Sequence, residues 1–278
     1  MIQLELGNKS ADISLHGGEL VALYQGTQNI LWHRDAKFWG ASAPLLFPIC
    51  GRLQDNTYFL DGTAYEMNIH GFARDMLFEV RRQSPASVTL RLTDNETTRA
   101  CYPFAFDFEV TYTLQETGLV ITFNITNRSD RNMPFSLGGH WGFVLSGPIN
   151  EYSLHFDAPT ALTREILDGA YLSGQSRSIQ LPDGILPLNE RICDDGTWVF
   201  REAPRSCTLH HGDKPTIRLE YPDTPHLLIW TLPDAPFVCI EPWNGLPDGA
   251  TSGELSAKDS ILLLSPTQSK KFTHRIIF

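Results

Sequence analysis

The chain has no long apolar run and no run of basic residues. A membrane-spanning helix takes about 20 consecutive apolar residues, and no segment of the 278 residues approaches that composition. Lys and Arg number 22 against 32 Asp and Glu, which gives a formal net charge of -10. Nucleic acids and anionic membranes are bound by clustered positive charge, so the sequence predicts neither as a partner.

Cysteine is also scarce, and its placement excludes two common frameworks. The five cysteines are odd in number, widely spaced and free of any CxxC pair, so neither a disulfide framework nor a zinc site is predicted. The N-terminus MIQLELGNKS alternates polar and apolar residues, whereas a secretory signal has a basic start followed by an apolar run. We therefore expect reduced thiols and a cytoplasmic location; the oligomeric state stays open.

Several catalytic motifs are missing as well. The sequence contains no G-x-S-x-G, no G-x-G-x-x-G, no phosphate-binding loop ending in Lys-Ser or Lys-Thr, and no H-E-x-x-H. Serine hydrolase, nucleotide-binding and zincin functions therefore have no support. We predict no bound cofactor and no metal site.

What the chain does contain is strand after strand. Residues 107–114 and 119–126 alternate apolar and polar side chains on either side of a short turn, the pattern of a β-hairpin. Similar short runs recur to the C-terminus, and only residues 96–104 and 161–169 could be helical. The sequence predicts an all-β fold of large stacked antiparallel sheets with few short helices, in a single domain over residues 1–278.

Three segments concentrate residues that can carry chemistry. PLLFPICGRLQDN and NIHGFARD contain Arg52 and His70, FSLGGHWGF contains His140, and FVCIEPWNGLPDG contains Glu241 and Trp243. Each segment ends a strand-like run beside an aromatic residue and a glycine. A histidine, a carboxylate and a guanidinium suit proton transfer on a polyhydroxylated ligand, because Glu (pKa about 4.3) takes a proton and His (about 6.5) gives one near neutral pH.

Purely structural roles compete with these functional ones. His70 could be an ordinary turn histidine, and the glycines before His140 could mark a close approach of two strands. A lone carboxylate at Glu241 is costly to bury unless it is paired or used. Arg74 and Asp75 are expected to pair with each other at the surface. Four tryptophans could be core residues or could stack on a sugar ring, namely Trp32, Trp39, Trp141 and Trp243.

The ordered set LLFPICGRL, HGFARD, CYPFAFDFEVTYTL, MPFSLGGHWGF and CIEPWNGLPD resembles the aldose 1-epimerase (galactose mutarotase) family, and most closely its LacX-like bacterial branch. The resemblance covers nearly the whole chain. It implies a galactose mutarotase-like β-supersandwich with the sugar in an open cleft on the concave face of a large sheet. It also implies an isomerase that interconverts the anomers of an aldose, with a small-molecule sugar as its partner.

The resemblance implies roles at the matching positions. His140 is the expected general acid towards the ring oxygen, and Glu241 is the expected general base on the anomeric hydroxyl. Arg52 and His70 are expected to bind the sugar, and Trp243 to line its site.

The chain also departs from the family pattern. Gly-Gly-His replaces the Asn-His pair of the full-length mutarotases, and Trp141 stands where close relatives usually have proline. The substrate-gripping aspartate of the family has only a vague counterpart in Asp194 or Asp195. The sugar could be free or phosphorylated, although no cluster of Arg and Lys is visible in the sequence.

Two other functions remain open. A non-catalytic sugar-binding or sensing module would need neither proton carrier. A glycoside hydrolase would need two opposed carboxylates, and Asp248 is a poor second to Glu241.

Overall fold

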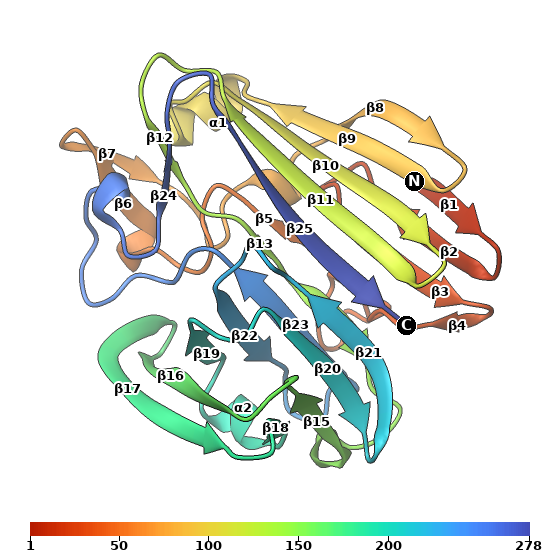
Figure 1. Ribbon diagram of the computed structural model, residues 1–278. Coiled ribbons are helices and arrows are strands. Elements are labelled where there is room, and N and C mark those ends of the chain that lie inside the picture. Colours follow the sequence, from red (N-terminus) through yellow and green to blue (C-terminus); the bar gives the residue numbers. More distant parts are fainter.

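Antiparallel strands make up most of the computed structural model, which describes residues 1–278 (Figure 1). They form two large sheets of nine and eight strands and three small ones. The prediction of an all-β fold with few short helices is confirmed. No helix has the length and apolar character needed to cross a membrane.

The nine-stranded sheet has the order β18-β15-β20-β21-β25-β11-β10-β9-β8. Its strands are β8 (Glu79–Ser84), β9 (Ser87–Thr93), β10 (Phe106–Gln115), β11 (Gly118–Asn127), β15 (Tyr152–His155), β18 (Ile185–Pro187), β20 (Ser206–His211), β21 (Lys214–Glu220) and β25 (Ser269–Ile277). The predicted hairpin of residues 107–114 and 119–126 is β10 and β11, which pair along their full length.

The eight-stranded sheet has the order β17-β16-β19-β22-β23-β13-β5, with β14 also pairing with β23. Its strands are β5 (Leu45–Leu46), β13 (Gly138–Gly139), β14 (Trp141–Val144), β16 (Thr160–Asp168), β17 (Tyr171–Leu181), β19 (Trp198–Arg201), β22 (His226–Trp230) and β23 (Phe237–Trp243). Residues 161–169 therefore belong to a strand and its turn, and the prediction that they could be helical is wrong.

The remaining elements are short. The small sheets comprise β1 (Ile2–Leu6), β2 (Lys9–Ile13), β3 (Leu20–Gln25) and β4 (Gln28–Asn29); β6 (Thr57–Leu60) and β7 (Thr63–Glu66); and β12 (Met133–Phe135) and β24 (Leu262–Leu264). The helices are α1 (Glu96–Cys101) and α2 (Arg191–Asp194), with single 3₁₀ turns at Gln54–Asn56, Ala73–Asp75, Ile149–Glu151 and Leu255–Ala257. Asn95 caps α1 by accepting a hydrogen bond from the Thr98 amide.

One apolar cluster of 63 buried residues includes side chains of both large sheets. Phe108 of β10 and Phe123 of β11 belong to it, as do Val238 and Ile240 of β23. This shared core supports our proposal of one domain over residues 1–278. Since side chains alternate between the two faces of a strand, Glu241 of β23 points away from this core. The outer face of the eight-stranded sheet is therefore the one that carries Glu241.

Candidate active site

A cavity of about 610 Å³ lies on that outer face, within the size range of small-molecule sites. It is lined by all five residues that the sequence singles out as site residues, namely Arg52, His70, His140, Glu241 and Trp243. These residues come from segments far apart in the chain. The fold therefore brings the predicted candidates to one place.

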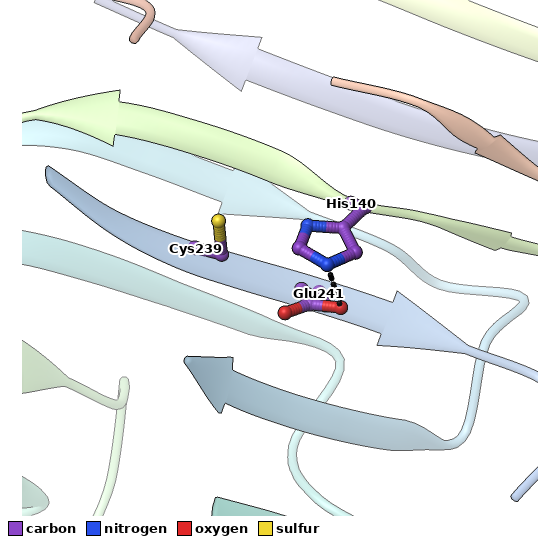
Figure 2. Close-up of side chains that lie close together, drawn as sticks. All are labelled: His140, Cys239 and Glu241. Atoms are coloured by element: carbon purple, nitrogen blue, oxygen red, sulfur yellow. Dashed lines mark ion pairs between the residues drawn. The ribbon is translucent and has the colours of Figure 1, made fainter. Parts of the chain in front are cut away.

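His140 and Glu241 lie side by side at the floor of this cavity. Glu241 is on β23, and His140 occupies the break between β13 and β14, both of which pair with β23. The His140 amide donates a hydrogen bond to the carbonyl of Pro44, 3.3 Å away, which fixes the backbone at the break. As Figure 2 shows, the imidazole lies over the carboxylate, with 3.3 Å between Nε2 of His140 and Oε2 of Glu241.

The Glu241 side chain is 1% exposed, and neither of its oxygens makes a hydrogen bond. Burial raises its pKa well above the usual 4.5, because a carboxylate loses its hydration in the interior. The indole of Trp243 lies close enough to oppose this rise in pKa, but its N–H does not reach hydrogen-bonding geometry. Burial therefore favours the protonated form of this carboxyl group, whose oxygens accept no hydrogen bond within the protein although Nε2 of His140 lies 3.3 Å from Oε2.

Burial also shifts the pKa of His140 in favour of its neutral form. Burial lowers its pKa from 6.5 to about 3, since burial penalises the imidazolium as it does the carboxylate. Trp39 lies against the imidazole with ring centroids 4.8 Å apart, and Trp230 meets it edge-on at 5.6 Å. The two indoles help to bury this side chain, and with a pKa of about 3 the imidazole is neutral near neutral pH.

His70 is held by two reciprocal hydrogen bonds with Gly51. The Gly51 amide donates to Nδ1 of His70 over 3.1 Å, and the His70 amide donates to the Gly51 carbonyl over 2.9 Å. Burial lowers the pKa of His70 well below 6.5. Because Nδ1 accepts a hydrogen bond, the proton of the neutral ring is on Nε2. His70 can therefore donate one hydrogen bond from Nε2.

The turn that carries His70 requires a glycine directly after it. His70 has φ of 68° and Gly71 has φ of 72°, a left-handed conformation in which side chains are strained. A Cβ atom at Gly71 would overlap the carbonyl oxygen of Phe47. The glycine of NIHGFARD therefore allows the tight turn that positions His70, and this segment forms one wall of the cavity.

Arg52 follows Gly51 and is partly buried at the edge of the cavity. Its Nη1 donates to Oδ1 of Asn56 over 3.3 Å, and it forms no ion pair. Most of its five N–H donors are therefore free to bind a ligand.

The structure adds cavity residues that sequence reasoning missed. The sequence leaves Trp39 open between a core role and stacking on a sugar ring, and it does not single out Trp230. Both residues line the cavity. The loop that carries Trp39 is anchored by Glu19, whose Oε1 accepts the amides of Ser42 and Ala43 over 2.7 and 3.0 Å. Gly142 leaves the space that the Trp39 ring fills, since a Cβ there would lie 2.8 Å from it.

Two of the four tryptophans are core residues. Trp32 and Trp141 are fully buried and line no part of the cavity. The indole N–H of Trp141 lies 3.2 Å from Nδ1 of His274, to which it donates a hydrogen bond. The tryptophan that departs from the family pattern beside His140 thus points into the core.

Neither of the other carboxylate candidates lines the cavity. Asp248 pairs with Lys258, and its Oδ2 accepts the Gln54 amide over 2.9 Å. Asp195 accepts hydrogen bonds from Arg164, over 2.9 Å, and from the indole N–H of Trp198, over 3.3 Å.

Asp194 also lies outside the cavity. Neither aspartate of this segment lines the cavity, although the adjacent Gly196 and Thr197 do. The cavity nevertheless contains an aspartate from another segment, Asp75.

Arginines gather at the cavity although no cluster is visible in the sequence. Arg34 and Arg74 line it together with Arg52. Arg34 lies 3.8 Å from Glu19, and Arg74 lies 3.8 Å from Asp75, as expected for the latter pair. Two of the three guanidinium groups therefore have a carboxylate partner.

Comparisons with known proteins identify the family of this chain. Residues 1–259 match the family model of aldose 1-epimerase. The chromosomal LacX protein of Lactococcus lactis is 27% identical over 98% of both chains.

Solved structures agree as well. A galactose mutarotase related enzyme from Lactobacillus acidophilus is 30% identical, with a TM-score of 0.92 over 100% of this chain and 97% of its own. A galactose mutarotase-like protein from Lactobacillus casei is 28% identical, also with a TM-score of 0.92, over 100% and 99%. The chain therefore belongs to the aldose 1-epimerase family, in its LacX-like branch, and is an isomerase with the galactose mutarotase-like fold.

Proposed function

We propose that the protein interconverts the α and β anomers of an aldose by acid and base catalysis of ring opening. Glu241 takes the proton of the C1 hydroxyl while protonated His140 gives a proton to the ring oxygen. The bond between C1 and the ring oxygen breaks, and a free aldehyde forms. After rotation about the C1–C2 bond the ring closes on the other face of C1, with the two groups in exchanged roles.

The observation that carries this proposal is the buried contact of 3.3 Å between His140 and Glu241 at the cavity floor. The ring oxygen and the C1 hydroxyl are attached to the same carbon. An acid and a base that act on both atoms at once must therefore be neighbours. A glycoside hydrolase instead uses two carboxyl groups about 5 to 9.5 Å apart, and Glu241 has a histidine beside it.

The protonation of the pair also suits this reaction. Burial raises the pKa of Glu241 and lowers that of His140, so it favours the neutral form of both side chains, in which the carboxyl group carries the proton that the imidazole lacks. Transfer of that proton from Glu241 to His140 yields the carboxylate base and the imidazolium acid without exchange with solvent. Sugar hydroxyls that donate to the unpartnered oxygens of Glu241 would favour this transfer, since hydrogen bonds stabilise the charged form.

Other groups at the cavity are proposed to hold the sugar. His70 donates from Nε2, and the free N–H groups of Arg52 bind sugar hydroxyls. The faces of Trp39, Trp230 and Trp243 cover the apolar C–H faces of the ring. Arg52 and His70 together thus fix the sugar with C1 over the pair.

A neutral aldose is the proposed substrate, because Arg34 and Arg74 already face carboxylates. An aldose 6-phosphate is the second candidate, favoured by the three guanidinium groups at one cavity. The cytoplasm is the proposed location, supported by five unpaired cysteines.

The test is anomer exchange measured by NMR on a panel of aldoses and their 6-phosphates, in a buffer that itself catalyses mutarotation poorly. His140→Gln and Glu241→Gln should each slow exchange by about 10² to 10⁴. A matched control is the His211–Glu151 pair, 2.9 Å apart and outside the cavity; His211→Gln and Glu151→Gln should leave exchange unchanged. Sugar binding without exchange above the buffer rate would instead support a non-catalytic binding module.

A further inference from the structure

We propose that Cys239 completes a binding site for a thiophilic divalent cation of the zinc class, formed with His140 and Glu241. Coordination itself stands on the geometry alone. The consequence that such a cation blocks anomer exchange rests on the proposed function of the same two residues.

Cys239 and Glu241 are two positions apart on β23, so their side chains leave the same face of the strand. One nitrogen of His140, the Sγ of Cys239 and one carboxylate oxygen of Glu241 all lie within 4.8 Å of one another. Figure 2 shows Cys239 and Glu241 on one strand, β23, with the imidazole of His140 beside them. Thiolate, imidazole and carboxylate are the three ligand types that zinc takes in proteins.

The spacing can be compared with that of a tetrahedral zinc site. Bond lengths of about 2.0 to 2.2 Å to nitrogen and oxygen and about 2.3 Å to sulfur place the ligand atoms roughly 3.3 to 3.7 Å apart. The 3.3 Å between Nε2 of His140 and Oε2 of Glu241 already matches one edge of that tetrahedron. The thiol has to approach by no more than roughly 1 Å, which side-chain rotation can supply.

The ligand atoms are also free to bind. Both oxygens of Glu241 are buried without a hydrogen-bond partner on a side chain that is 1% exposed. The Sγ of Cys239 is in none of the hydrogen bonds of the protein and lies in a small apolar cluster with Trp32 and Phe237. A cation would arrive through the sugar cavity, which His140 and Glu241 line; Cys239 does not line the cavity itself and lies beside Glu241 on the same face of β23. Its fourth position would then face the cavity and hold water.

Bound metal would remove both proton carriers at once. Binding displaces the proton of the Cys239 thiol and that of the Glu241 carboxyl, and it occupies the lone pair with which His140 would take up a proton. The cation would also fill the place of the C1 hydroxyl. Inhibition should therefore be reversible by a chelator and competitive with sugar.

Coordination is tested with cobalt(II), which gives a near-ultraviolet absorption band when a thiolate binds it. Chelator-treated wild-type protein should develop this band with one equivalent of cobalt, whereas Cys239→Ala and the isosteric Cys239→Ser should not. Cys207→Ala is the matched control, because Cys207 is also buried but lies on β20 and is not grouped with His140 and Glu241; it should keep the band. Absence of the band in wild type, or its persistence in Cys239→Ala, would overturn the site.

Inhibition is tested with zinc(II) in the anomer-exchange assay. Half-inhibition of Cys239→Ala should need at least about 10-fold more zinc than wild type, since even loss of an outer-shell partner weakens metal binding about 10- to 100-fold. Cys207→Ala should match wild type. Equal zinc sensitivity of all three proteins would refute a role for the thiol. The cobalt spectrum does not depend on activity, so a protein without mutarotase activity but with the band would disprove the proposed function and leave the metal site standing.

Discussion

Replacement of Glu241 by glutamine should lower activity and change the pH dependence of stability in a defined way. The substitution keeps the size of the side chain but removes its titrating proton. We expect anomer exchange to fall by about 10² to 10⁴. We also expect the free energy of unfolding of Glu241→Gln, relative to wild type, to increase as the pH rises above about 4.5.

The sign follows from the raised pKa of Glu241. Between 4.5 and its raised native pKa, folded wild type holds a proton that the unfolded chain has released. Rising pH therefore destabilises the wild type through this group, by up to about 1.4 kcal/mol per pH unit. The contribution is fully present below pH 4.5 and is lost as the pH passes through the native pKa. Inside this window the variant should therefore gain on the wild type with rising pH, and the gain should stop once the pH has passed the native pKa.

Urea unfolding of both proteins at a series of pH values from 5 upward measures this difference. His140 is present in both proteins and, with its pKa near 3, stays neutral in the native state over that range. Its contribution therefore cancels in the comparison. Glu151→Gln, at an exposed His–Glu pair, is the control and should show no such slope. A difference that stays flat or falls with pH would mean that His140 and Glu241 form an ion pair in the empty protein, and would refute the neutral pair.

Three further predictions concern binding, pH and the core. Arg52→Ala should raise KM about 10- to 100-fold with a smaller effect on kcat, because hydrogen bonds from a charged donor contribute about 1.5–3 kcal/mol. Arg131→Ala, at an arginine outside the cavity, is the control and should leave KM unchanged. Equal KM values for both variants would contradict the role of Arg52. The pH profile of kcat/KM should contain no inflection from His140 near pH 6.5, since burial lowers the pKa of His140 to about 3; an inflection near 6.5 that His140→Gln removes would contradict this shift. Trp141→Phe should keep anomer exchange but lower the free energy of unfolding by about 1–3 kcal/mol in urea titrations, because Nδ1 of His274 loses its hydrogen-bond donor. A loss of exchange in a stable variant would instead place Trp141 in the active site.

Much of the fold could be predicted because strand alternation is a local signal. In β10 the buried residues Phe108, Val110 and Tyr112 alternate with less buried ones, as the sequence indicates. The helix prediction for residues 161–169 was wrong because Leu162 and Ile166 are spaced as on one face of a helix. The segment instead pairs with β17 on one side and β19 on the other. Tertiary pairing overrides local propensity there.

The site could be predicted only where a side chain follows a distinctive local pattern. His70 and Glu241 end strand-like runs beside a glycine or a proline, and both line the cavity. Trp230 lies within the apolar run HLLIW, which reads as an ordinary buried strand. The contact of Trp39 with His140 depends on a long loop that Glu19 holds. No spacing in the sequence encodes that contact.

The two faces of β23 explain why one strand serves both stability and chemistry. Val238 and Ile240 pack into the shared core and make the strand rigid, while Cys239 and Glu241 alternate with them on the outer face. A buried carboxyl group that makes no hydrogen bond within the protein lowers the stability of the fold, yet its oxygens are available to a sugar hydroxyl. The carboxyl group is also available to a cation. The thiol of Cys239, two residues away, would favour a zinc-class metal over magnesium or calcium. If both proposals hold, sugar and metal compete for the same two oxygens, and protection of the enzyme from zinc by its substrate identifies the sugar that fits.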